Sequence, residues 1–380
     1  MTTALLLVGA ERLLRVPSLQ QWLPTRTHYY DAGVVVREDA LNATLAAYGR
    51  IDVLFVGSSI VRTNIQPLIF DALVRKHTGN PVVSFNAGLS GLWPEAVALY
   101  LEHVWLPRAS PRLVVQGIRY PELAATTHAL RPDQVFSGTV EAAWKETSWR
   151  TRVYSAAAVR IRLLQYRGAL TRSLERYING RPGPISEEHR ELGIDPRGHT
   201  PRLPTFREAR ARGAVEDEET ASDGNCLSGR CRVGFTGLSR AIAAARRSGA
   251  DYILVNIPEH GRRWGGEGGR TRYQEYLACL RAFARSERVL FVDPTEGDPS
   301  MFQDDAEYSD TYHMSPAGAT RLTSMLAARI DPRAASADDV TTRALVRSRS
   351  KRAIRPLCRP LRESSSTDND LSLVGCRYGL

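Results

Sequence analysis

Five short apolar runs alternate with helical patterns between residues 51 and 330, and this alternation constrains the fold more than any other feature. Each run stops at a glycine, a proline or polar residues, and the stretches between runs carry apolar residues three and four positions apart. Strands that alternate with helices pair in parallel through right-handed crossovers. We therefore predict an α/β protein, a three-layer α/β/α sandwich around a five-stranded, mostly parallel sheet. The predicted strands are residues 51–57, 81–86, 112–118, 251–257 and 289–293.

The rest of the chain divides by composition. Residues 1–50 form a lead-in that ends in a short helical piece, and residues 51–330 form the α/β domain. An insertion interrupts this domain at about 142–234, first as a long arginine-rich helix and then as an irregular segment rich in proline and glycine. Residues 331–380 are basic and aperiodic, and we expect them to be a disordered tail.

The first residues leave two interpretations open. Ala4 to Ala10 is apolar, but Glu11 and Arg12 interrupt it before the roughly 20 residues that a membrane span needs. The stretch also lacks the basic start and cleavage site of a signal peptide. It is either the end of a membrane helix whose beginning precedes Met1 or a short amphipathic helix.

Charge and cysteine content narrow the choice of partners. The net charge of +10 is spread along the chain, without a compact basic block interleaved with aromatic residues. It favours anionic surfaces in general, and we expect no nucleic-acid partner. Of the five cysteines, Cys226 and Cys231 could close a small disulfide in an oxidising compartment, whereas Cys279 fits a core position. No metal site is predicted, because no second Cys or His pair lies near Cys226 at suitable spacing.

A possible nucleophile follows the first predicted strand. That strand breaks at Gly57, and Ser58 and Ser59 come next, at the carboxyl edge where open α/β sheets bind their ligands. Either serine could be a nucleophile, or both could simply cap the following helix. Asp310 and His313, just before the last helix, could supply the base and the carboxylate that orients it.

Three short motifs resemble those of SGNH (GDSL-type) hydrolases and acyltransferases. They are Gly57-Ser58-Ser59, Asn86-Ala87-Gly88 and Asp310-Thr311-Tyr312-His313. The Gly-Ser-Ser version is similar to the membrane-associated branch that includes the D-alanyl transfer protein of teichoic acid synthesis and the alginate acetylation proteins. The resemblance implies a flavodoxin-like sheet, a catalytic triad of Ser59, His313 and Asp310, and no cofactor. It also implies that the backbone N–H groups of Ser59 and Gly88 stabilise an oxyanion.

One motif departs from that family. The third strand should end in Gly-x-Asn-Asp, but this chain has Gly117-Ile118-Arg119-Tyr120. Arg119 could replace the missing asparagine as an oxyanion donor, bind an anionic substrate, or be a surface residue. Among possible substrate-binding residues, Asn86 belongs to the second motif, Trp93 either walls the pocket or packs in the core, and His260 either lines the cleft or is a loop residue.

These observations lead to one expected function and one alternative. The resemblance implies an ester hydrolase or O-acyltransferase that acts on an acylated glycan, a cell-envelope polymer or a small ester. Its partners would include a membrane or a membrane-bound acyl donor protein. Its location would be the cell envelope, membrane-associated or extracytoplasmic, or the cytoplasm if no anchor precedes Met1. The alternative is a catalytically decayed relative that binds an anionic polymer or serves as an assembly scaffold.

Overall fold

The computed structural model describes residues 2–14, 16, 32–124, 149–150, 153, 178, 195–201, 232–265 and 268–330. All of them belong to the first of two compact units, Met1–Ser336 and Ala337–Leu380. The predicted disordered tail, most of the predicted insertion and the Cys226–Cys231 pair lie outside the described residues.

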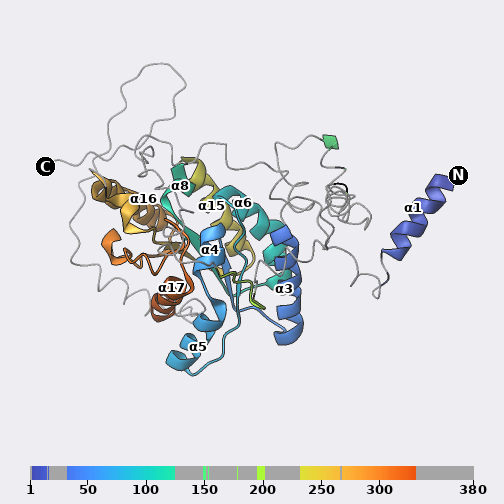
Figure 1. The fold of residues 1–380 in the computed structure, drawn as a ribbon, viewed down its shortest axis with the longest axis horizontal. Helices are drawn as coiled ribbons and strands as arrows, with labels where there is room; N and C mark the ends of the chain where they lie inside the picture. Colours follow the sequence, from blue (N-terminus) through green and yellow to red (C-terminus); the bar gives the residue numbers. More distant parts are fainter. Residues whose placement is uncertain are drawn as a thin grey trace, which may run out of the picture. The chain divides into compact units, whose positions relative to one another are not determined.

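A five-stranded parallel sheet forms the centre of the fold, as predicted (Figure 1). Its order is β2-β1-β3-β4-β5, so the chain reverses direction across the sheet between β1 and β3, and ligands of doubly wound folds bind at such a switch point. Each strand lies inside an apolar run, because strands covered on both faces need apolar residues at nearly every position. The strands are β1 (Val53–Val56), β2 (Ser84–Asn86), β3 (Leu113–Ile118), β4 (Asp251–Asn256) and β5 (Leu290–Val292).

Helices cover both faces of the sheet, which confirms the predicted three layers. Val53 and Phe55 of β1 pack with α4 (Ser59–Asn64), α5 (Pro67–Thr78) and α17 (Pro316–Arg329). The alternate residues Leu54 and Val56 point to the opposite face. That face is covered by α3 (Ala32–Tyr48), α6 (Pro94–Tyr100), α15 (Arg232–Arg247) and α16 (Gly269–Ser286).

Two prolines shape the helices that follow β1 and β2. The helical stretch after Ser59 is split into α4 and α5, because Pro67 disfavours helical dihedrals at Gln66. α6 continues through a π-helical turn, η1 (Leu101–Trp105), into α7 (Leu106–Ala109). Pro107 gives the reason, since its ring would clash with the carbonyl of His103 in a regular α-helix.

Part of the predicted irregular insertion is built into the domain. Residues 195–200 lie along β2, where Asn86 N donates to Arg197 O at 2.8 Å. The same segment reaches α4, since Thr200 N donates to Arg62 O at 3.1 Å. Arg37 of α3 fixes it from a third side by donating to Gly198 O at 3.0 Å. The segment therefore covers the edge of the sheet beside the helix that begins at Ser59.

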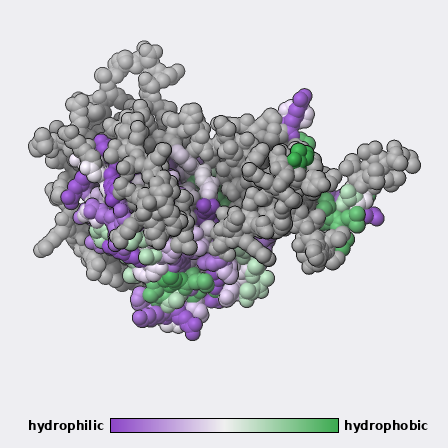
Figure 2. Space-filling model, in the orientation of Figure 1, coloured by the Kyte–Doolittle hydropathy of each residue, from purple (hydrophilic) through white to green (hydrophobic). Residues whose placement is uncertain are grey.

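Large apolar side chains are exposed at a few places among the described residues. Figure 2 shows one such area over α5, where Leu68 is 49% exposed. The N-terminal apolar stretch forms α1 (Thr2–Leu13), with Val8 and Leu13 exposed. Within the described residues, no helix combines the length and the apolar character that crossing a membrane requires.

Candidate active site

Ser59 lies at the start of α4, directly after the turn that ends β1. Gly57 in this turn has a φ of 151°, and a Cβ there would come within 2.4 Å of Val61 Cγ2 and 2.8 Å of Gly117 O. Ser58 is the N-cap, and its Oγ accepts from Ile60 N at 3.4 Å. The backbone N–H of Ser59, in the first helical position, has no acceptor within the helix. Capping therefore falls to Ser58, which leaves Ser59 available for chemistry.

Glycines let α4 approach the sheet closely. Val61 packs against both Gly57 and Gly117, where a Cβ would come within 2.4 and 2.5 Å of Val61 Cγ2. On the other side, a Cβ at Gly88 would come within 2.5 Å of Arg62 N. Gly57, Gly88 and Gly117 lie near the ends of three neighbouring strands. The absence of a side chain at each of them allows the helix that begins at Ser59 to pack closely against the sheet.

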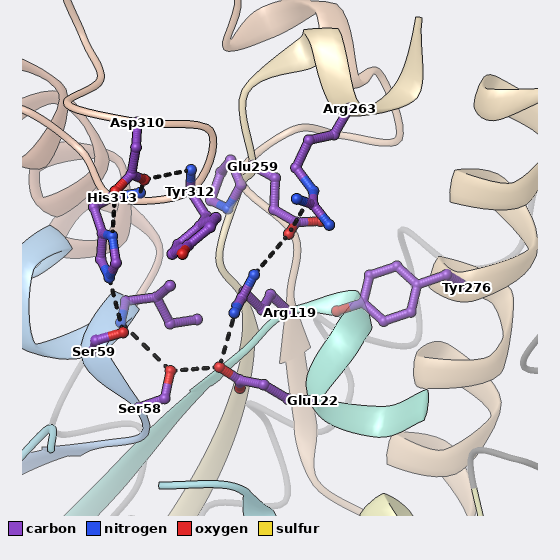
Figure 3. Close-up of polar contacts among 12 residues, drawn as sticks. Ser58, Ser59, Arg119, Glu122, Glu259, Arg263, Tyr276, Asp310, Tyr312 and His313 are labelled. Atoms are coloured by element: carbon purple, nitrogen blue, oxygen red, sulfur yellow. Dashed lines mark hydrogen bonds and ion pairs between the residues drawn. The ribbon is translucent and has the colours of Figure 1, made fainter. Parts of the chain in front are cut away.

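Ser59, His313 and Asp310 form one hydrogen-bonded series (Figure 3). Ser59 Oγ lies 2.8 Å from His313 Nε2, and His313 Nδ1 lies 2.7 Å from Asp310 Oδ2. An ionised carboxylate can only accept, so Nδ1 carries the proton and Nε2 is left to accept from the Ser59 hydroxyl. This geometry can deprotonate Ser59 as it attacks an acyl carbon.

Asp310 is held in its ionised form. Burial would raise its pKa, but hydrogen bonding to His313, the charge of that ring and two backbone bonds outweigh burial and lower it. The backbone bonds come from Tyr312 N at 3.0 Å and His313 N at 2.7 Å, both to Oδ1. The same contacts fold the loop, so the carboxylate both orients the imidazole and shapes the segment that carries it.

Asn64, which the sequence analysis did not single out, ties the two halves of the site together. It is fully buried in the last turn of α4. Its Nδ2 donates to Tyr312 O at 3.1 Å, and its Oδ1 accepts from Met314 N at 2.9 Å. These two bonds bracket His313 and fix it relative to the helix that begins at Ser59. An asparagine in a helical stretch gives no sequence signal of such distant partners.

Two of the predicted substrate-binding residues are buried and have partners within the protein. Asn86 is fully buried, and its Nδ2 donates to Val61 O at 2.7 Å and Ile65 O at 2.8 Å, so it anchors α4. His260 is also buried, with Nε2 3.0 Å from Asp305 Oδ1 and its ring against Tyr308.

The predicted backbone donor Gly88 has a partner in this structure. Its N–H donates to Asn86 Oδ1 at 3.0 Å, which leaves the Ser59 N–H as the backbone donor beside the nucleophile. Trp93 is half-buried at the N-cap of α6.

Arg119 is not a surface residue, since its side chain is only 17% exposed. Its Nε lies 3.4 Å from Glu122 Oε1 and its Nη1 lies 3.3 Å from Glu259 Oε1. Its guanidinium also lies 4.2 Å from the ring centroid of Tyr312, the residue before His313. Of the three interpretations of Arg119, the oxyanion donor and the anion-binding residue remain.

Glu122 connects this cluster to the nucleophile turn. The Ser58 hydroxyl donates a short hydrogen bond to Glu122 Oε1, the same oxygen that faces Arg119. Complete burial raises the pKa of Glu122 to about 7, although the charge of Arg119 and the bond from Ser58 both act to lower it. Glu122 follows the third strand in the sequence, and its local pattern gives no sign of this role.

The fold is a parallel α/β sandwich, and a serine, an imidazole and a carboxylate are hydrogen-bonded in series at its switch point. This arrangement is that of a candidate active site with a serine nucleophile.

No protein-family model matches the chain, and no curated protein matches it significantly. Several solved structures align with most of the chain, and some of them are named as lipases or acylhydrolases. TesA aligns at 15% identity and a TM-score of 0.33, over 74% of this chain and 98% of its own.

Two further structures align to a similar extent. A GDSL-like lipase from Bacteroides thetaiotaomicron VPI-5482 aligns at 12% identity and a TM-score of 0.33, over 77% of this chain and 95% of its own. A lipase/acylhydrolase from Enterococcus faecalis aligns at 15% identity and a TM-score of 0.31, over 74% of this chain and 98% of its own. Likenesses at these values carry no functional argument, so the chemistry rests on the geometry of the site.

Proposed function

We propose that this chain is a serine-dependent acyl-ester hydrolase. The observation that carries the proposal is the series Ser59 Oγ, His313 Nε2, His313 Nδ1 and Asp310 Oδ2, with contacts of 2.8 and 2.7 Å. A serine with no chemical role has no requirement for a buried imidazole that is itself oriented by a carboxylate. These three groups in this order are what nucleophilic acyl transfer requires.

The reaction would proceed through an acyl-enzyme. His313 takes the Ser59 proton as Oγ attacks the ester carbonyl, and the resulting imidazolium is stabilised by Asp310. The Ser59 N–H and the cationic Arg119 side chain are the donors that we assign to the developing oxyanion. His313 then protonates the leaving alcohol. His313 deprotonates a water molecule that attacks the acyl-enzyme, and it then returns that proton to Ser59 Oγ as the acid leaves.

We further propose that the enzyme can catalyse O-acyl transfer, in which a sugar hydroxyl instead of water attacks the acyl-enzyme. The Gly-Ser-Ser motif and the net charge of +10 support an acylated glycan or envelope polymer as substrate, since many such polymers are anionic. A membrane or membrane-bound acyl donor is the corresponding partner, and the cell envelope is the corresponding location.

Labelling with a fluorophosphonate probe tests the nucleophile. We expect stoichiometric modification of Ser59, loss of labelling in Ser59→Ala, and unchanged labelling in Ser300→Ala, which removes a serine of a separate turn, η5 (Pro299–Met301). Equal labelling of wild type and Ser59→Ala would overturn the proposal. Binding of an anionic glycan without turnover, unaffected by Ser59→Ala, would instead favour the decayed-scaffold alternative.

A further inference from the structure

A chain of contacts joins the residue before the nucleophile to the residue before the base. Ser58 Oγ donates to Glu122 Oε1, and Arg119 Nε lies 3.4 Å from the same oxygen. The Arg119 guanidinium then lies over the ring of Tyr312, 4.2 Å from its centroid (Figure 3). We call these four residues, Ser58, Glu122, Arg119 and Tyr312, the charge bridge.

Arg119 of the charge bridge forms a second ion pair, with Glu259, and Glu259 also pairs with Arg263. Arg119 Nη1 lies 3.3 Å from Glu259 Oε1, and Arg263 Nε lies 3.2 Å from that oxygen. Both carboxylates are almost fully buried. Burying two cations and two anions is weakly stabilising at best, because their desolvation offsets their attraction. Such a cluster beside a candidate nucleophile therefore calls for a role other than stability.

The position of the bridge indicates that role. One end holds Ser58, whose neighbour Ser59 carries the reactive hydroxyl, and the other end contacts Tyr312, whose neighbour His313 carries the base. Glu122 is the only bridge member that contacts the Ser58 hydroxyl and the arginine through one atom. A change at Glu122 is thus transmitted to both reacting side chains.

We propose that Glu122 is a positioning residue for acyl transfer, which aligns Ser59 with His313 through Ser58 on one side and through Arg119 and Tyr312 on the other. This inference rests on the proposed function and goes beyond it, because it assigns a role to a residue that does not touch the reacting atoms. It also makes the alignment of the site depend on the ionisation of Glu122.

Glu122 changes its charge near neutral pH. Burial raises its pKa to about 7, so near neutral pH the carboxyl changes from a neutral acid to the anion that pairs with Arg119. The charged and titratable groups that act on Glu122 are Arg119, Glu259 and Tyr276, and Arg263 pairs with Glu259. On the far side of Arg119 lie Tyr312 and the pair His313 and Asp310. Acidification therefore removes one of the two carboxylates of Arg119 and loosens the bridge.

The rate of fluorophosphonate labelling of Ser59, measured from pH 5 to pH 9, tests the inference. In wild type we expect an acid limb with two ionisations, one from the base and one from Glu122. In Glu122→Gln we expect roughly 10- to 100-fold slower labelling at pH 8 and an acid limb with one ionisation fewer, since a small displacement of reacting groups costs about that much. Glu102→Gln, which removes a carboxylate paired with Arg240 and Arg247 instead, should match wild type.

Ser58→Ala distinguishes the link through Ser58 from the link through Arg119 and Tyr312. It also provides a second test of the inference if Glu122→Gln does not fold. It cuts the link to the nucleophile turn but keeps the ion pair, so we expect slower labelling with both ionisations retained. Overlapping pH profiles of wild type and Glu122→Gln, or equal labelling of wild type and Ser58→Ala, would overturn the inference and leave the proposed function intact. Absence of labelling in wild type would overturn the proposed function itself.

Discussion

Asn64 of α4 accepts a hydrogen bond from the backbone N–H of Met314, the residue that follows His313, at 2.9 Å. Its amide nitrogen donates to Tyr312 O, on the other side of the same histidine, at 3.1 Å. The helix α4 thus begins at the candidate nucleophile, and its last turn is hydrogen-bonded to the loop that carries the candidate base. One short helix sets the position of both groups.

Asn64→Ala should therefore lower both stability and reactivity. It leaves two buried backbone groups without their partner, which costs on the order of 3 kcal/mol of unfolding free energy. It also frees the His313 loop, so Ser59 should label more slowly. Urea unfolding and probe labelling measure the two effects. Asn80→Ala, at an exposed asparagine, is the matched control and should change little. Wild-type labelling by a folded Asn64→Ala variant would contradict this view.

Gly117 and Gly57 should tolerate alanine differently. The three atoms nearest to a Cβ at Gly117 belong to side chains, with Val61 Cγ2 at 2.5 Å and Ile257 Cγ1 at 2.8 Å, so Val61→Ala should partly rescue Gly117→Ala. A Cβ at Gly57 also meets the backbone oxygen of Gly117 at 2.8 Å, on a residue whose φ is 151°. Val61→Ala should therefore fail to rescue Gly57→Ala. Thermal unfolding of the single and double variants distinguishes the two cases, and equal rescue would contradict the proposed packing.

The ionisation of Glu122 should appear in the pH dependence of stability. Its pKa is raised from 4.5 to about 7 in the folded protein, so between these values the folded state binds more protons than the unfolded chain. Wild-type stability should hence fall as pH rises from about 4.5 to 7, by about 3 kcal/mol at most from this group. Glu122→Gln lacks this contribution, so its stability relative to wild type should improve from pH 5 to pH 8. Urea unfolding at both pH values checks this, and a constant difference would argue against a raised pKa.

Gly198, in the built-in part of the insertion, should be among the least replaceable residues outside the motifs. Its φ is +85°, and a Cβ there would come within 2.2 Å of Asn86 O. Gly79 has a similar φ of +74° with open space around it, so Gly79→Ala should cost only the backbone strain of about 1–2 kcal/mol. Gly198→Ala should cost clearly more in urea unfolding. A similar loss at the two sites would show that residues 195–200 do not pack on β2 as described.

The sequence predicted what depends on local pattern. Parallel strands buried on both faces are continuous apolar runs, so all five strands were found. Polar residues after the first strand and before the last helix pointed to Ser59, Asp310 and His313. Contacts with distant partners give no local signal in the sequence. The hydrogen bonds of Asn64 to the His313 loop are one case, and those of Asn86 to the carbonyls of Val61 and Ile65 are another.

The separation of Ser59 from His313 by 254 positions has a consequence during synthesis. A ribosome adds residues from the N-terminus, so Ser59 is exposed long before His313 has been made. A nascent or truncated chain that ends before His313 would carry a chemically ordinary hydroxyl, and the reactivity proposed for Ser59 would appear only once the final αβ unit has been translated and folded.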